Sequence, residues 1–186
     1  MTKIPLTVAC LISFAPLAQA QAPTPDPWAD VRFLVGEWRG SINSEEGKGT
    51  VTKSFRLILS GMFLQEKSRF DFPPQPNFPN GMVTTHASFL AQDRTRKLML
   101  YRQHHEDYRK GSYFLAKDKS GPAKVVFEAE PSMNAPTVWS VRETWEVVSP
   151  NAFVEIIEVA QDGKTFVVQS RTAFQRRQPE APVTKK

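Results

Sequence analysis

From Trp38 to Gln175 the chain is divided into short runs that alternate apolar and polar residues, with turn-forming residues between them. Ten runs are recognised, at 38–44, 50–59, 62–71, 82–91, 97–104, 109–116, 124–129, 137–148, 152–159 and 165–176. Alternation of this kind is typical of strands that have one covered and one solvated face. None of the runs shows the 3.6-residue periodicity of an amphipathic helix, which argues against a parallel sheet built from strand–helix–strand units.

The connections between the runs are mostly of hairpin length and carry turn residues, as at Ser60-Gly61 and Asp162-Gly163. An open meander of ten strands would expose two unpaired edges, and closure into a barrel removes both. We therefore expect an all-β fold, an antiparallel up-and-down barrel of about ten strands. A β-sandwich is the alternative, but Greek-key crossovers are long and only two longer connections occur, at 72–81 and 130–136.

The first 20 residues have the order of a secretory signal peptide. Lys3 is followed by an uncharged, mostly apolar stretch, and Ala18-Gln19-Ala20 is a small-residue cleavage site. The stretch is too short to span a membrane as a helix. We expect cleavage near Ala20 and a periplasmic or secreted protein. A buried N-terminal helix and a lipoprotein signal at Cys10 are the alternatives; the apolar stretch before Cys10 is very short.

The only cysteine, Cys10, lies within this expected signal. A mature chain without cysteine has no disulfide framework, thiol nucleophile, zinc–thiolate site or iron–sulfur cluster. The formal net charge is +5, and basic residues are scattered among acidic ones. That distribution favours a solvated surface over a nucleic-acid partner.

The chain is expected to form one domain. Residues 21–27 are a proline-rich leader, 28–176 a single barrel domain, and 177–186 a flexible tail without apolar pattern. Asp26-Pro27 has the form of a helix N-cap followed by proline, and predicts a short N-terminal helix that stops at Gly36.

The segment Phe33–Gly40, FLVGEWRG, resembles the opening of lipocalin-like (calycin) barrels, in which a short helix, a glycine and a tryptophan lead into the first strand. The turn Gly61-Met62-Phe63-Leu64 and the last two strands are similar to bacterial secreted lipocalin-like domains of unknown function. The resemblance implies structural roles for Gly36 and Trp38. It also implies that an arginine of the last strand, Arg171 or Arg176, packs across Trp38.

The same resemblance extends to the ten-stranded haem-binding barrels related to nitrobindin. Those barrels place a histidine ligand on a late strand, whereas this chain has no histidine after His105. We therefore expect no haem of that kind, and no cofactor is indicated.

Two carboxylates occupy positions on faces that are otherwise apolar. Glu66 alternates with Leu64 and Phe70, and Glu143 alternates with Trp139 and Trp145. A carboxylate inside an apolar lumen must be paired or take up a proton, and such groups are enriched at functional sites. The alternative is a purely structural contact with Arg56, Arg171 or a tyrosine. The candidate ligand-binding residues are Phe55, Leu64, Glu66, Tyr101, Trp139, Glu143 and Trp145.

The histidines form no recognisable metal site. His104 and His105 are adjacent on an expected strand, so their side chains point to opposite faces, and no spacing typical of metal ligands occurs. His86 is read as a surface histidine, or one that is satisfied by neighbours. No nucleophile elbow, P-loop or dinucleotide fingerprint is present.

Three functions stay open. The first is an exported barrel that binds or carries a small, mostly apolar ligand, since barrels of this size can enclose a cavity. The second is a structural or assembly protein of the cell envelope with a filled barrel. The third is an enzyme that uses Glu66, Glu143 or His86 as acid or base. The sequence does not indicate the oligomeric state.

Overall fold

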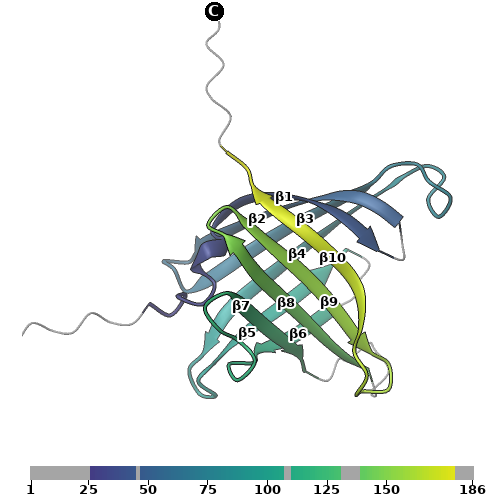
Figure 1. Ribbon diagram of the computed structural model, residues 1–186. Coiled ribbons are helices and arrows are strands. Elements are labelled where there is room, and N and C mark those ends of the chain that lie inside the picture. The colour runs from purple at the N-terminus through teal and green to yellow at the C-terminus, as the bar shows by residue number, and fades with distance from the viewer. Residues whose placement is uncertain (1–25, 45–46, 107–109, 131–138, 179–186) are drawn as a thin grey trace, which may run out of the picture.

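The computed structural model describes residues 26–44, 47–106, 110–130 and 139–178. Within these ranges ten antiparallel strands form one closed barrel (Figure 1). The strands are β1 (Gly36–Ser44), β2 (Gly47–Ile58), β3 (Phe63–Phe72), β4 (Met82–Asp93), β5 (Leu98–His105), β6 (Lys110–Leu115), β7 (Lys124–Ala129), β8 (Ser140–Ser149), β9 (Ala152–Ala160) and β10 (Val167–Arg176). Each strand pairs with the next in sequence, and β10 returns to β1.

The predicted up-and-down barrel is therefore confirmed, and all ten predicted strands are present with ends that differ by a few residues. The barrel is closed by the pairing of β1 with β10, which runs from Trp38 opposite Arg176 to Ser44 opposite Ser170. No edge strand is left unpaired. The expected signal peptide at 1–20, residues 21–25 of the leader and residues 179–186 of the expected tail lie outside the described residues.

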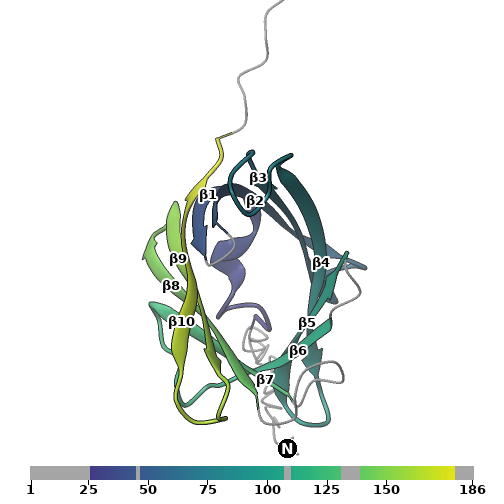
Figure 2. The same cartoon turned by 90° about the vertical axis from the view of Figure 1, so that its right-hand side faces the viewer.

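The barrel end at which β1 begins and β10 finishes is called the helix end, and the opposite end is called the far end. The predicted N-terminal helix is a turn followed by a single 3-10 turn, η1 (Arg32–Leu34). Asp26 Oδ1 accepts the backbone N–H of Trp28 at 3.0 Å, as the proposed cap requires. Val31 and Leu34 are completely buried at this end. In Figure 2 the ring of strands surrounds the short helix in projection.

Arg176 is the arginine that packs across Trp38, with its guanidinium carbon 4.2 Å from the ring centre. The same guanidinium donates to the carbonyl oxygens of Val35 at 2.7 Å and Phe33 at 2.6 Å. Gly36 has a φ of +130°, and a Cβ there would lie 2.5 Å from Arg176 Nη1. These contacts fasten the helix end to the last strand.

Arg171 does not share this role. Its side chain is 60% exposed on the outer wall, 3.5 Å from a carboxylate oxygen of Glu146. Strand alternation explains the difference. Arg171 and Arg176 are an odd number of positions apart, so their side chains point to opposite faces of β10.

Aromatic rings fill the half of the barrel next to the helix end. Phe153 lies between Trp38, at 4.8 Å in a T-shaped arrangement, and Phe174, stacked at 4.7 Å. Tyr101, Phe127 and Trp145 form a second group with ring centres 5.0–5.4 Å apart. We call this half the lower lumen; its rings are almost completely buried, so it is a packed core.

The inner face of β10 differs from the predicted alternation. Regular alternation along 165–176 would place Phe166 and Val168 on the inner face with Thr172 and Phe174, but Val168 is 55% exposed. A β-bulge between Val168 and Ser170 breaks the pairing of β10 with β9 and shifts the alternation there. Phe166 packs instead against Arg142, with the guanidinium carbon 4.2 Å from the ring centre.

Candidate functional site

The structure brings six of the seven candidate ligand-binding residues together inside the barrel. The six have at most 2% of their surface exposed and are Phe55, Leu64, Glu66, Tyr101, Glu143 and Trp145. Trp139 is the exception: it precedes β8 and is 42% exposed. The expectation that Trp139 lies inside was wrong because the alternation was extended beyond the first residue of that strand.

Lys53 of β2 is the centre of a buried polar group that we call the acid–lysine cluster, formed by Lys53, Glu66, Tyr101, Glu143, Trp145 and Glu155. The Lys53 ammonium lies 2.9 Å from Glu66 Oε1 and also contacts Glu155 Oε1. Burial alone would lower the pKa of Lys53, but the carboxylates of Glu155, Glu66 and Glu143 raise it above its usual range. Lys53 is therefore a permanent cation inside the barrel.

Glu66 is the ionised acid of this cluster. Its carboxylate accepts hydrogen bonds from Ser68 Oγ at 2.6 Å and from the Tyr101 hydroxyl at 2.5 Å. Burial tends to raise the pKa of Glu66, but the nearby Lys53 charge and these donors outweigh burial and lower it. Burial and the surrounding carboxylates raise the pKa of Tyr101, so its hydroxyl remains a neutral donor. The structural contact with a tyrosine, which was one alternative for Glu66, is present as the hydrogen bond from Tyr101. Arg56, another alternative, is 70% exposed on the outside of the barrel.

Glu143 has the opposite character. Its oxygens accept hydrogen bonds from Trp145 Nε1 and from Gln103 Nε2, each at 2.8 Å. No cation contacts it directly among the ion pairs of the described residues, since Lys53 is engaged by Glu66 and Glu155. Burial, then the nearby Glu155 charge, raise the pKa of Glu143 well above its usual range. The direction of this shift favours the protonated form of Glu143, in contrast to Glu66.

Beyond the cluster, toward the far end, several inward-facing side chains are only half-buried, although Val51 and Phe72 on the same inner faces are buried. We call this part the upper lumen. Its wall residues are Phe70, His86, Gln103, His105, Val141, Ile157 and Ser170. Partial exposure of inward-facing side chains means that solvent reaches this half of the barrel. The acid–lysine cluster separates the solvated half from the packed half.

Two histidines face each other in the upper lumen. His105 Nδ1 lies 3.2 Å from His86 Nε2, and the His86 ring is 4.7 Å from the Phe70 ring. His104, by contrast, is exposed on the outer wall beside Phe89. The prediction that His104 and His105 point to opposite faces is confirmed. His86 was read as a surface or satisfied histidine, and it faces the lumen.

Sequence reasoning missed Lys53, Glu155 and Gln103. Lys53 alternates with Val51 and Phe55, and Glu155 alternates with Phe153 and Ile157. The alternation that identified Glu66 and Glu143 therefore also places these two residues on inner faces. A lysine at such a position is a usable signal, since a buried lysine requires an acidic partner.

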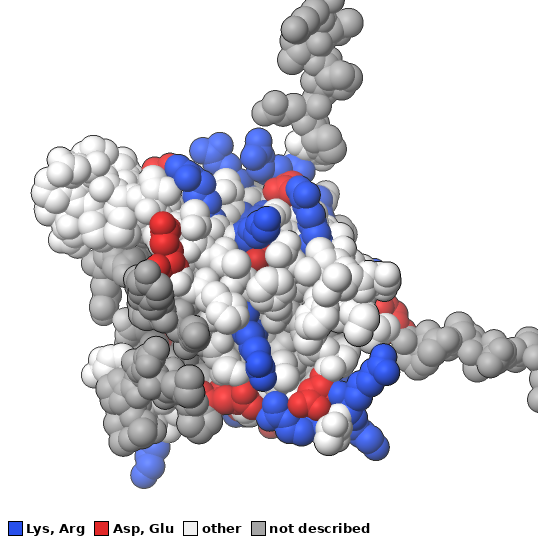
Figure 3. Space-filling view, turned by 180° about the vertical axis from the view of Figure 1, so that it is seen from behind, with Lys and Arg blue, Asp and Glu red and all other residues white. Residues whose placement is uncertain are grey.

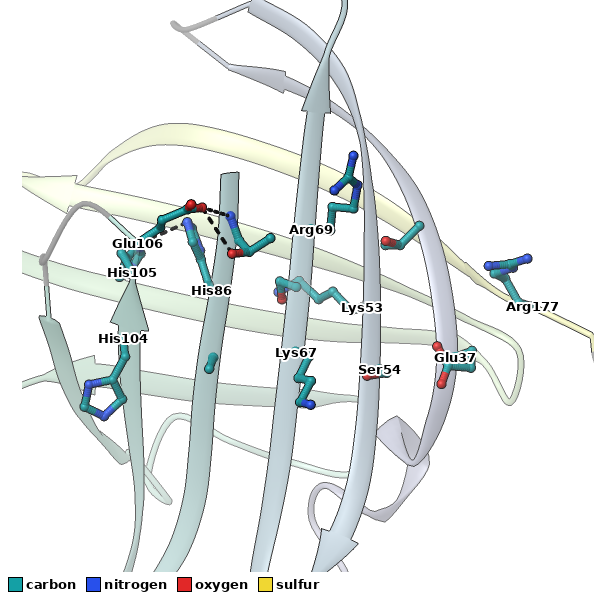
Figure 4. Close-up of a pocket in the computed structure, with 14 residues that line it drawn as sticks. Glu37, Lys53, Ser54, Lys67, Arg69, His86, His104, His105, Glu106 and Arg177 are labelled. Carbon is teal, nitrogen blue, oxygen red and sulfur yellow. Dashed lines mark hydrogen bonds between the residues drawn. The ribbon is translucent and has the colours of Figure 1, made fainter. Parts of the chain in front are cut away.

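A second concavity lies on the outside of the barrel, over β2 to β5, with a volume of about 600 Å³ (Figure 4). Cross-strand pairing determines which residues form its two rims. One rim carries Thr52, Arg69, Thr85 and Glu106, and the other Glu37, Ser54, Lys67 and His104. The inward-facing residues between the rims, such as Lys53 and His86, can contribute only backbone from this side.

The charged groups of this outer groove are largely engaged by neighbours. Glu106 accepts from the backbone N–H and hydroxyl of Thr85, and Glu37 pairs with Arg56. Arg69 lies 3.5 Å from Asp71. Both charge signs are interspersed over this side of the molecule (Figure 3). The outer groove is a weaker candidate than the upper lumen.

Across the described ranges, no three His, Cys, Asp or Glu side chains are grouped so that they could hold a metal ion. In the same ranges, no helix has the length and apolar character needed to cross a membrane.

The comparisons place the chain by fold alone. No protein-family model matches the sequence, and a search of curated proteins finds no match. Among solved structures, the crystal structure of Rv2717c from M. tuberculosis is similar with a TM-score of 0.55 and 10% identity, over 81% of this chain and 97% of that one. A redesigned β-barrel, b11L5F_LGL, matches at a TM-score of 0.41 and 12% identity, over 78% of this chain and 93% of that one. The first similarity supports the barrel fold.

Proposed function

We propose that this protein is an exported, lipocalin-like barrel that binds a small, mostly apolar ligand in the upper lumen. The observation that carries the proposal is the contrast between the two halves of the barrel: the lower lumen is packed, whereas several inward side chains of the upper lumen keep contact with solvent. A barrel that served only as a core would be expected to fill both halves.

The walls and floor of the upper lumen define the ligand. Phe70, Val141 and Ile157 offer apolar surface for its body. Gln103 and Glu143 lie at its floor, where they offer donors and acceptors to a polar head group. Sites of this kind combine apolar walls with a few fixed polar groups.

The test is native mass spectrometry of the protein purified from the periplasm, followed by denaturing extraction of any released compound. We expect a small-molecule adduct near one-to-one. Val141→Trp, which fills the upper lumen, should abolish it. Val168→Trp places the same ring on the outer wall, where Val168 is 55% exposed, and should retain it. A clean mass, together with no uptake of an apolar fluorescent probe, would contradict the proposal.

A second candidate function rests on Glu143. A buried carboxyl group whose pKa is raised, beside half-buried lumen walls, has the property required of a general acid. Replacement by the near-isosteric Glu143→Gln separates the two candidates: an enzyme would lose turnover, whereas a carrier would change only in affinity. The third possibility, an envelope structural protein, predicts neither an adduct nor turnover.

A further inference from the structure

The turn between β2 and β3 presents two large apolar side chains to solvent. Leu59 is 66% exposed and Met62 63% exposed. Leu59 and Ser60 have φ angles of 50° and 55°, in the left-handed region that a bulky residue such as leucine rarely adopts. The turn is closed by backbone hydrogen bonds from Gly61 to Ile58 and from Met62 to Leu59, both 3.1 Å. This costly conformation keeps Leu59 at the tip.

A concavity of about 660 Å³ lies beside this turn, between the N-terminal segment and the β4–β5 turn. Pro27, Trp28, Met62 and Phe63 form much of its wall. Two hydrogen bonds fix that wall: Trp28 Nε1 donates to Gly61 O at 2.9 Å, and Gln92 Nε2 donates to Pro27 O at 2.6 Å. The pocket therefore combines apolar and polar residues, and two tertiary hydrogen bonds hold its sides together.

The rim of the pocket carries two cations, Arg94 and Lys97. Both are exposed, and neither takes part in an ion pair within the part of the chain that the structure describes. Asp93, the acid of this turn, is occupied, because it pairs with Arg96 at 2.8 Å and accepts the backbone N–H groups of Thr95 and Arg96. Two positive charges thus remain uncompensated at the edge of an apolar surface.

We propose that this corner of the helix end docks onto an anionic lipid bilayer. Leu59 and Met62 enter the boundary between head groups and acyl chains, while Arg94 and Lys97 contact lipid phosphates. Exposed apolar tips flanked by unpaired cations are complementary to such a surface, because apolar burial and attraction to anionic lipid act in the same direction. Two inserted side chains and two cations give weak, reversible binding. The proposal does not depend on a ligand in the upper lumen.

The test is co-sedimentation of the purified protein with vesicles of phosphatidylcholine alone, and with vesicles of equal parts phosphatidylcholine and phosphatidylglycerol. We expect sedimentation only with the anionic vesicles, and release at high salt, because exposed charges are screened. Leu59→Ser/Met62→Ser should lower the bound fraction at least about tenfold. The matched control is Val83→Ser/Val167→Ser, which removes two apolar side chains that are 48% and 57% exposed elsewhere.

The charge component has its own pair of variants. Arg94→Glu/Lys97→Glu should abolish binding, whereas Lys67→Glu/Lys164→Glu, which makes the same change in net charge at other exposed sites, should preserve it. A Leu59→Trp reporter should shift its fluorescence to the blue when anionic vesicles are added. Soluble glycerol phosphate should neither cause that shift nor displace the protein from vesicles. Equal loss in the control variants, or no sedimentation at low salt, would overturn the proposal; so would binding of a protein partner through this corner in place of lipid.

Discussion

The ammonium of Lys53 lies 2.9 Å from Glu66 Oε1, and the two side chains are only 4% and 2% exposed. They come from neighbouring strands, β2 and β3, and meet where the packed and solvated halves of the barrel join. An ion pair buried to this degree gains little over an apolar pair of the same shape, but it is costly to break. The acid–lysine cluster therefore makes each of its members depend on the others.

Lys53→Met should destabilise the barrel by about 3–5 kcal/mol, because Glu66 and Glu155 lose the cation that compensates them. The free energy of unfolding is measured by urea titration. Arg56→Met is the control, since Arg56 and its partner Glu37 are 70% and 47% exposed and such pairs contribute at most about 1 kcal/mol. Similar losses of unfolding free energy in both variants would show that the buried pair contributes no more to stability than the exposed pair.

Glu143 should make stability depend on pH in a direction opposite to that of most carboxyl groups. Its pKa is raised in the folded protein, so the native state holds a proton that the unfolded chain releases near 4.5. Its contribution is complete below 4.5 and is lost as the pH rises toward the folded pKa. Urea unfolding at pH values from 4.5 upward should show this decline, and Glu143→Gln should flatten it.

Glu66 provides the internal comparison. Its pKa is lowered in the folded protein, so its contribution is present above 4.5 and is lost as the pH falls through the folded value. Glu66→Gln should therefore change the acid limb of the stability profile and leave the slope above 4.5 in place. If both variants changed the same limb, the assignment of a lowered pKa to Glu66 and a raised pKa to Glu143 would be wrong.

Arg176→Ala should cost about 2–3 kcal/mol, because two backbone carbonyls at the helix end lose a charged donor and Trp38 loses its cation. Arg176→Lys should not restore the loss, since an ammonium cannot reproduce the planar fork. Thermal unfolding of these variants is compared with that of Arg171→Ala, for which a change within about 0.5 kcal/mol is expected.

Gly36→Ala tests the same junction from the opposite side. A Cβ at this position would lie 2.5 Å from Arg176 Nη1, and φ is +130°. We expect a loss of about 1–3 kcal/mol in unfolding free energy. Gly121→Ala is the matched control, because nothing lies within 4 Å of its added Cβ. A neutral result at Gly36 would mean that the guanidinium can move without cost.

The strands could be predicted because each one carries its own alternation and its own turn residues. Glu66 and Glu143 could be assigned to inner faces for the same reason. The bulge in β10 could not be predicted, because Val167 and Val168 are both apolar and both exposed. The sequence of these two residues therefore does not show that one extra residue is inserted. Local alternation predicts faces only while pairing is regular.

The contacts within the acid–lysine cluster could not be predicted from local alternation. Lys53 and Glu155 lie 102 positions apart, and their contact depends on the curvature and closure of the whole barrel. Alternation places both residues inside, but it does not indicate which two of the three acids Lys53 will contact. That choice decides which carboxyl group lacks a cation, so the raised pKa of Glu143 emerges only from the three-dimensional arrangement.

The pairing of β10 with β1 also affects the order in which the barrel can fold. The first strand of the sheet finds its second neighbour only when the last strand has been synthesised. Until residues 167–176 emerge, a nascent chain has an open meander with two bare edges, and Trp38 lacks Arg176. Ring closure joins positions 138 residues apart, from Trp38 to Arg176, and pairings between positions so distant in sequence slow folding.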